Sequence, residues 1–127
     1  MHATILFGHG SRDPAWRKPI DSVAESMREL KPQCVVRCAF LELTQPDLAS
    51  VTADLVATEV KHITIVPMFL GVGRHAREDL PVLVTALQQT YPAVNFILRP
   101  SVGEDPRVVA MLARLSLPDA EVSVAQG

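Results

Sequence analysis

The sequence predicts an α/β protein with an open, four-stranded parallel sheet and helices on both faces. Four short apolar runs alternate with four longer segments in which the apolar residues follow helical spacing. Strand followed by helix, four times over, implies right-handed crossovers between parallel strands. The common arrangement of such a sheet places the strands in the order 2-1-3-4.

The four apolar runs are expected to form the strands because they are rich in valine, isoleucine and phenylalanine, as buried parallel strands usually are. Pro67 cannot donate a hydrogen bond to a neighbouring strand, so we expect the third strand to bend or stop pairing there. Cys34 and Cys38 would lie about 13 Å apart along the second strand, which favours small core residues over a disulfide or a shared metal. The runs cover residues 3–7, 34–40, 63–69 and 94–98.

The helical segments carry start signals of their own. Asp13 and Asp105 each precede a proline, the pattern of an N-cap followed by the first helical residue. Thr44, with Asp47 three residues later, resembles a capping box for the second helix. The segments with apolar spacing of i, i+3 and i+4 lie within residues 20–30, 48–55, 83–87 and 108–115.

Length, composition and charge exclude several classes of protein. A chain of 127 residues with 48% hydrophobic residues fits one domain, expected over residues 1–117, with a C-terminal tail without regular structure at 118–127. A net charge of -2 and a pI near 6.0 do not favour a nucleic-acid partner. The longest nearly uncharged stretch, residues 63–73, is too short to cross a membrane. We therefore expect a soluble, cytoplasmic protein.

Two histidines are expected to meet at one edge of the sheet. In open α/β sheets, ligands bind beyond the carboxyl ends of the strands, at the point where the crossovers change direction. His9 follows the first strand and His75 follows the third, which are neighbours in the predicted order. Neutral imidazole binds cobalt, iron, nickel or zinc and also accepts protons near pH 7. His2 and His62 lack this placement, and we interpret them as surface residues.

The residues alone leave other functions open. Residues 71–76 fit the nucleotide-binding pattern G-x-G-x-x-A, but they follow the third strand, and so short a pattern is frequently accidental. A phosphotransfer role for His9 would need arginines around one phosphate, which Arg12, Arg74 and Arg77 offer. A phosphate-binding or nucleotide-binding α/β domain is therefore one alternative.

Three loop motifs occur together in this chain, and the joint pattern is specific. They are L-F-G-H-G-S-R-D at residues 6–13, A-F-L-E at 39–42 with Pro46, and V-P-M-F-L at 66–70 followed by Gly73, His75 and D-L-P at 79–81. From residue 1 to about residue 115, the chain resembles the small sirohydrochlorin chelatases of the class II chelatase family.

The resemblance implies a chelatase-like fold and an enzyme that inserts a divalent metal into sirohydrochlorin in cobalamin or sirohaem biosynthesis. Cobalt is favoured over iron or nickel. The resemblance also implies that His9 and His75 are the metal-binding and catalytic pair, with Glu42 assisting at the same edge of the sheet. The metal is then a substrate, and no tightly bound cofactor is expected. Longer relatives contain two such halves, so this short form is expected to act as a homodimer.

The chemistry of metal insertion fits these residues. Two imidazoles form an incomplete metal shell, which can release the metal, and a histidine or carboxylate can accept a proton from the ring nitrogens. Imidazole binds metal only when neutral, so we expect insertion to slow below about pH 6.5.

A non-catalytic metal or tetrapyrrole carrier is the second alternative. The side chains expected to contact the carboxylate-rich substrate are Arg12, Glu42, Arg74, Arg77 and Arg99.

Overall fold

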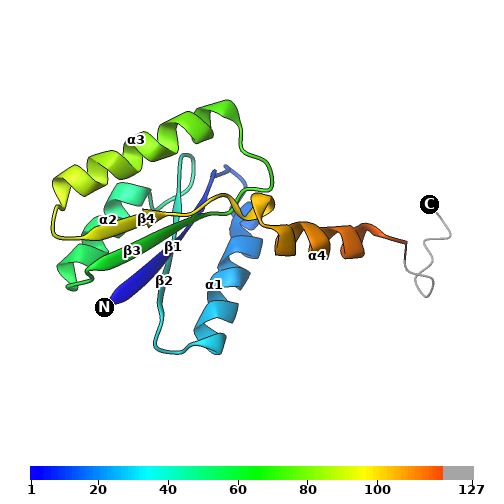
Figure 1. Cartoon of the computed structure of the whole chain (residues 1–127), viewed down its shortest axis with the longest axis horizontal. Helices are drawn as coiled ribbons and strands as arrows, with labels where there is room; N and C mark the ends of the chain where they lie inside the picture. Colours follow the sequence, from blue (N-terminus) through cyan, green and yellow to red (C-terminus); the bar gives the residue numbers. More distant parts are fainter. Residues whose placement is uncertain (119–127) are drawn as a thin grey trace.

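Four parallel strands form one sheet in the order β2-β1-β3-β4 in the computed structural model, which describes residues 1–118. The predicted fold class and strand order are therefore confirmed (Figure 1). Except for Pro118, the tail predicted at 118–127 lies outside the described residues. The strands are β1 (His2–Gly8), β2 (Val35–Phe40), β3 (His62–Pro67) and β4 (Asn95–Leu98).

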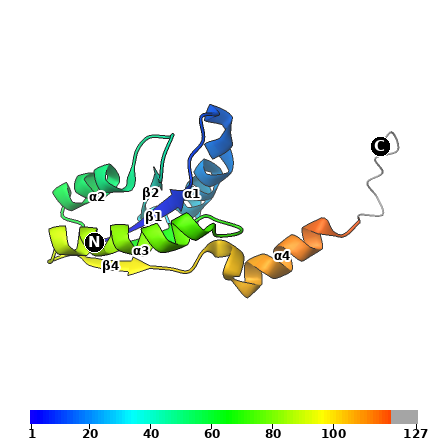
Figure 2. The ribbon, with the colours of Figure 1, turned by 90° about the horizontal axis from the view of Figure 1, so that it is seen from above.

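Helices cover the two faces of the sheet unequally. Helices α2 (Leu48–Ala57) and α3 (Arg74–Thr90) pack against one face, where their leucines meet the buried residues of the central strands β1 and β3. Helix α1 (Lys18–Leu30) packs against the other face, over β1 and β2. Helix α4 (Pro106–Ser116) has no buried residue and extends away from the sheet (Figures 1 and 2). The fourth predicted helical segment therefore forms a helix, but this helix covers neither face of the sheet.

Aspartate side chains cap the first residues of η1 (Pro14–Arg17), α2 and α4. Asp13 caps the 3-10 turn η1, and Asp105 caps α4 by accepting a hydrogen bond from the Arg107 backbone nitrogen at 2.8 Å. The predicted capping box at Thr44 is wrong, because the N-cap of α2 is Asp47, which accepts a hydrogen bond from the Ser50 backbone nitrogen at 2.8 Å. The third strand ends at Pro67, as predicted.

The two cysteines are free and half-buried, and they pack against the α1 side of the sheet, as expected for small core residues. Burial raises the pKa of the Cys38 thiol. Within residues 1–118, no helix combines the length and the apolar character needed to cross a membrane.

Removing the cap of α2 is expected to destabilise the fold. Replacing Asp47 by alanine should lower the free energy of unfolding by about 1 kcal/mol, measured by urea denaturation at pH 7. The hydrogen bonds from Ser50 lower the pKa of Asp47 below its ordinary 3.8. The carboxylate therefore stabilises the folded state at pH values above 3.8, and this contribution is lost as the pH falls through the lowered value.

The Asp47→Ala protein and the wild type should consequently approach equal stability in strong acid. Asp54, an exposed aspartate within the same helix, provides the matched control, because Asp54→Ala removes a charge but no cap. Equal losses from both variants at pH 7 would mean that charge, and not capping, is responsible.

Candidate functional site

The loop that carries His9 is joined to the loop after β2 by backbone hydrogen bonds. Leu41 donates to the Gly8 carbonyl at 3.0 Å, and Glu42 donates to the His9 carbonyl at 3.1 Å. Gly10 has a φ of 108°, a conformation that side chains rarely adopt, and a β-carbon there would overlap the Glu42 carbonyl oxygen. The close approach of the two loops therefore requires glycine at position 10.

A side-chain contact strengthens the same junction. The Thr44 hydroxyl accepts a hydrogen bond from the Ser11 backbone nitrogen at 2.9 Å and donates one to the Ser11 carbonyl at 2.8 Å. Thr44 therefore joins the two loops, which explains why it does not cap α2. Sequence patterns did not predict this role, because the contact joins residues of two different loops.

His9 and Glu42 form a pair at this junction. The His9 Nε2 atom lies 3.1 Å from Glu42 Oε1, and both side chains are about half exposed, at 53% and 56%. A carboxylate only accepts hydrogen bonds, so in neutral His9 this contact assigns the proton to Nε2 and leaves a lone pair on Nδ1. The geometry therefore offers one free imidazole nitrogen beside a negative charge.

His75 lies on the first turn of α3 and not in the preceding loop, where the sequence analysis placed it. The N-cap of this helix is Gly73, and Ala76 is buried behind His75. His9 and His75 line one cavity of about 310 Å³, together with Phe69, Gly71, Gly73, Arg74 and Ala76. Two histidines that are 66 positions apart in the chain therefore share one opening at the carboxyl ends of β1 and β3.

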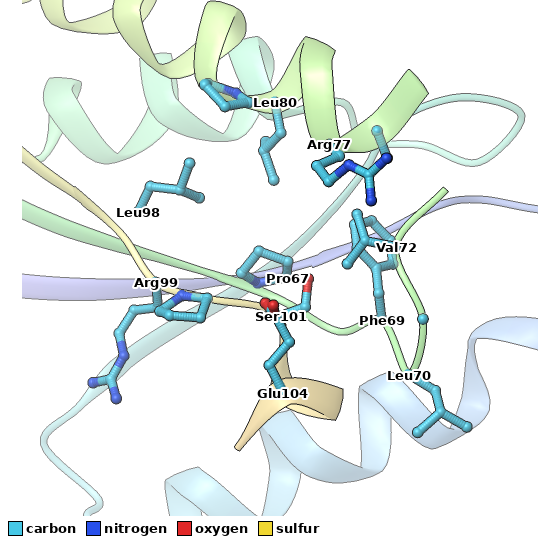
Figure 3. A pocket seen from close by; sticks show the side chains of 14 residues that line it. Pro67, Phe69, Leu70, Val72, Arg77, Leu80, Leu98, Arg99, Ser101 and Glu104 are labelled. Carbon is cyan, nitrogen blue, oxygen red and sulfur yellow. The ribbon is translucent and has the colours of Figure 1, made fainter. Parts of the chain in front are cut away.

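A second cavity, of about 320 Å³, lies beside the first and is lined in part by the same residues, Phe69, Gly71 and Ala76. Its walls are largely apolar. In Figure 3, Arg77 reaches toward this cavity from α3, whereas the guanidinium group of Arg99 points away from its centre. The carboxylate of Glu104 lies close to Ser101, a residue of the cavity wall that is 6% exposed.

The predicted arginines are therefore distributed over several surroundings. Arg74 lines the histidine cavity and forms an exposed ion pair with Glu78 at 3.1 Å. Arg77 and Arg99 line the second cavity. Arg12 is exposed in the His9 loop and lines neither cavity. Within residues 1–118, Glu42 is the one member of the predicted substrate-binding set whose side chain forms an ion pair or hydrogen bond with a histidine of the pair.

The sequence analysis missed three residues of this region. Phe69 forms a wall between the two cavities, and Ser101 and Glu104 line the second one. The sequence feature that marks this region is Gly103. Glycine allows two backbone segments to approach closely, and a β-carbon at this position would overlap the Leu70 carbonyl oxygen.

The chemistry that this arrangement offers is loose metal binding next to a proton acceptor. Two imidazoles leave most coordination positions of a divalent cation open to other ligands. No group of three or more histidine, cysteine or acidic side chains in residues 1–118 is placed to hold a metal ion. Glu42 adds a carboxylate that can accept a proton or orient His9.

Comparison with known proteins connects this geometry to one family. The CbiX family profile matches residues 3–116. A sirohydrochlorin cobaltochelatase from Methanococcus aeolicus is 32% identical over 88 residues, which cover 69% of this chain and 62% of the relative. A sirohydrochlorin cobaltochelatase from Sulfolobus acidocaldarius is 27% identical over 112 residues, covering 88% of this chain and 87% of that one.

Solved structures share the fold over nearly the whole chain. A cobalamin (vitamin B12) biosynthesis CbiX protein from Marinobacter aquaeolei superposes with a TM-score of 0.79 and 30% identity, covering 91% of this chain and 93% of the other. The sirohydrochlorin chelatase SirB from Bacillus subtilis, in complex with cobalt, has a TM-score of 0.75 and 26% identity. The match covers 89% of this chain but 48% of SirB, so this chain corresponds to about half of that protein.

Proposed function

This chain belongs to the CbiX family, and from that premise we propose that it is a metal chelatase that inserts a divalent metal into sirohydrochlorin. The matched region spans 62% of the length of the Methanococcus aeolicus cobaltochelatase and 59% of the Methanopyrus kandleri one. The activity and the substrates are therefore proposals for this chain. The proposed activity and substrates rest on one observation, which is that His9 and His75 line the same cavity and that Glu42 lies beside His9.

In this proposal, the two histidines hold the incoming metal. The proton on His9 Nε2 is directed to Glu42, so Nδ1 is the nitrogen available to the metal. His75 supplies the second imidazole from the first turn of α3. A metal with only two protein ligands is bound weakly enough to leave for the four nitrogens of the macrocycle.

The same residues handle the protons that metal insertion releases. Each pyrrole nitrogen that loses its proton needs an acceptor within hydrogen-bond reach. Glu42 can accept one of these protons, and His9 can accept a proton at Nδ1 once the metal has left that nitrogen. Both side chains are about half exposed, so the proton can pass on to water.

The arginines and the second cavity supply a surface for the rest of the substrate. Sirohydrochlorin combines an apolar macrocycle with many carboxylates, so it needs both an apolar wall and local cations. Phe69, Leu80 and Leu98 provide the wall, and Arg77 provides the cation that reaches toward it. We assign Arg74 to the histidine cavity and Arg12 and Arg99 to the rim, for carboxylates farther out.

We propose cobalt as the natural metal, with iron and nickel as alternatives, and treat it as a substrate with no tightly bound cofactor. The similarity to sirohydrochlorin cobaltochelatases and to SirB, solved with cobalt and with Fe³⁺, supports this order. A cytoplasmic location is supported by two half-buried cysteines that remain free. A homodimer is supported by the 48% coverage of SirB, because a second copy would supply the missing half.

Turnover with purified substrate tests the proposed function. The protein is mixed with an excess of sirohydrochlorin and with cobalt, nickel or ferrous iron, and the absorption spectrum of the macrocycle is followed against protein-free mixtures. We expect faster insertion with protein than without it, fastest for cobalt, and many product molecules per protein chain.

The same assay separates the alternatives. A metal or tetrapyrrole carrier would bind the ligands but stop after one equivalent. A phosphate-binding or nucleotide-binding domain would leave the protein-free rate unchanged and would gain thermal stability from phosphate compounds. Either result would contradict the proposed enzyme.

A further inference from the structure

Leu43, in the loop after β2, adopts a backbone conformation that side chains rarely take. Its φ is 63°, and the Thr44 backbone nitrogen donates a hydrogen bond to the Glu42 carbonyl at 2.7 Å. A hydrogen bond from residue i+2 to residue i closes a γ-turn, and a positive φ at the central residue marks the strained form of this turn. Because glycine adopts a positive φ without strain, a leucine at this position is unfavourable for the backbone.

The contacts around the turn hold this conformation in place. On one side, the Thr44 hydroxyl bonds to the backbone nitrogen and the carbonyl of Ser11. On the other side, Arg17 donates a hydrogen bond from Nη1 to the Gln45 carbonyl at 3.0 Å. Strained conformations persist only where the surrounding structure fixes them, and they cluster at functional sites. The strain at Leu43 therefore points to a role for its side chain.

The side chain of Leu43 contributes to neither hydrophobic cluster of the sheet in residues 1–118. It is 55% exposed, whereas Leu41 of the same loop packs against the core. A single exposed leucine is common on protein surfaces, but here the exposure is combined with an unfavourable φ. Neither the backbone nor the core of the described residues therefore benefits from a leucine at position 43.

Glu59, with a φ of 66°, is the other residue besides glycine with a positive φ in residues 1–118, and its conformation has a structural explanation. Glu59 follows Thr58, the C-cap of α2, and the Val60 backbone nitrogen then donates to the Leu55 carbonyl at 3.2 Å. Helices commonly end with one residue in the left-handed conformation. Leu43 lies between β2 and α2, where no helix ends, so this explanation does not extend to it.

Leu43 directly follows the residue that accepts a proton in the proposed reaction. Glu42 pairs with His9 through its side chain and also donates from its backbone nitrogen to the His9 carbonyl at 3.1 Å. A carboxylate that accepts a proton from a pyrrole nitrogen lies beside the flat carbon ring to which that nitrogen belongs. The residue after Glu42 is therefore within reach of an apolar part of the macrocycle.

The strand order places Leu43 on the side of His9 that lies away from the second cavity. Strand β1, which leads to His9, runs between β2, which leads to Leu43, and β3 (Figure 1). The apolar wall of the second cavity, with Phe69 and Leu98, lies on the side of β3 and β4. A flat macrocycle centred on a metal between His9 and His75 extends to both sides. The β2 side then needs an apolar contact of its own.

We propose that Leu43 is a substrate-binding residue whose side chain packs against the macrocycle beside Glu42. This inference rests on the proposed function and adds a residue to the same site. Burying the exposed part of a leucine side chain is sufficient to change an affinity about tenfold. The contact is the same in the bound substrate and during metal transfer, so it affects KM and leaves kcat unchanged.

Leu43→Gly separates the side chain from the backbone strain. Because glycine relieves the positive φ, the variant should unfold at the same temperature as the wild type or at a higher one. We expect KM for sirohydrochlorin to rise about tenfold, with kcat within about twofold. Fluorescence titration of the metal-free macrocycle should show the same loss of affinity. Calorimetry should show unchanged binding of Co²⁺ alone, because Leu43 is not a metal ligand.

Three further variants show whether the apolar character of Leu43 is responsible. Leu43→Asn introduces a polar residue that also tolerates a positive φ, and KM should rise as it does in Leu43→Gly. Leu43→Met keeps an apolar side chain and should retain KM within about twofold. Glu59→Gly makes the same backbone change before the start of β3, at the end of the sheet opposite to His9, and should leave KM unchanged.

The outcomes separate this inference from the proposed enzyme. Wild-type KM and macrocycle affinity in Leu43→Gly or in Leu43→Asn would overturn the substrate contact and leave the enzyme in place. Unchanged affinity together with a lower mass in light scattering would mean that Leu43 packs on a second copy, which also contradicts the contact. If the wild type binds sirohydrochlorin without inserting metal, the enzyme fails and the titrations still decide the contact. No binding by the wild type would overturn both.

Discussion

Replacing His75 by alanine is expected to reduce the rate of metal insertion by at least about 100-fold, and His9→Ala should have an effect of similar size. Each substitution removes one of the two imidazoles in the cavity, which in the proposed site leaves a single protein ligand for the metal. Both histidines are exposed, so neither variant should lose fold stability. Stopped-flow absorption of the macrocycle gives the rate, and thermal unfolding gives the stability.

His62→Ala provides the matched control. His62 is an exposed histidine at the start of β3, at the opposite end of the same strand from the cavity, where it stacks on His2. It should leave insertion unchanged, although it removes the same chemical group. Wild-type rates in His9→Ala or His75→Ala, or an equal loss in His62→Ala, would contradict the assignment of the pair.

Replacing Gly10 by alanine is expected to have the second largest effect, although this residue has no reactive group. A side chain at φ 108° is strained, and its β-carbon would overlap the carbonyl oxygen of Glu42. The loops after β1 and β2 must then separate, which breaks the contact between His9 and Glu42. We expect the insertion rate to fall at least about tenfold and the free energy of unfolding to fall by about 1–3 kcal/mol.

Gly71→Ala is the comparison that isolates this geometry. Gly71 lines the same cavity as the histidines, but a β-carbon there would meet no atom within 4 Å. This variant should retain both rate and stability within a factor of about two. If Gly10→Ala behaved in the same way, the close approach of the two loops would be irrelevant to activity.

Much of the fold could be predicted because its signals are local. Each strand contains a short, mostly apolar run, and Asp105 before Pro106 is an N-cap pattern that predicts the start of its helix. The strand order followed from the rule for parallel sheets, and that order brings His9 and His75 to adjacent strand ends. The shared cavity was therefore within reach of sequence reasoning.

The errors concern contacts between distant parts of the chain. Thr44 looks like a cap in its own segment, but its hydroxyl bonds to Ser11, 33 residues earlier. His75 was expected in the loop after the third strand, although α3 already begins at Arg74. The path of α4 depends on how Gly103 meets the strand-end loop at Phe69. None of these contacts leaves a periodic pattern in the sequence.

The backbone ties between the loops after β1 and β2 give the two histidines unequal rigidity. His9 is held by a continuation of the sheet ladder and by Glu42, whereas the side chain of His75, on the first turn of α3, has no hydrogen bond or ion pair within residues 1–118. In the proposed reaction, as the macrocycle approaches, the bond between the metal and His75 can lengthen at a smaller energetic cost than the bond between the metal and His9. We therefore expect a stepwise transfer in which the metal leaves His75 first and stays bound to His9 until the second step.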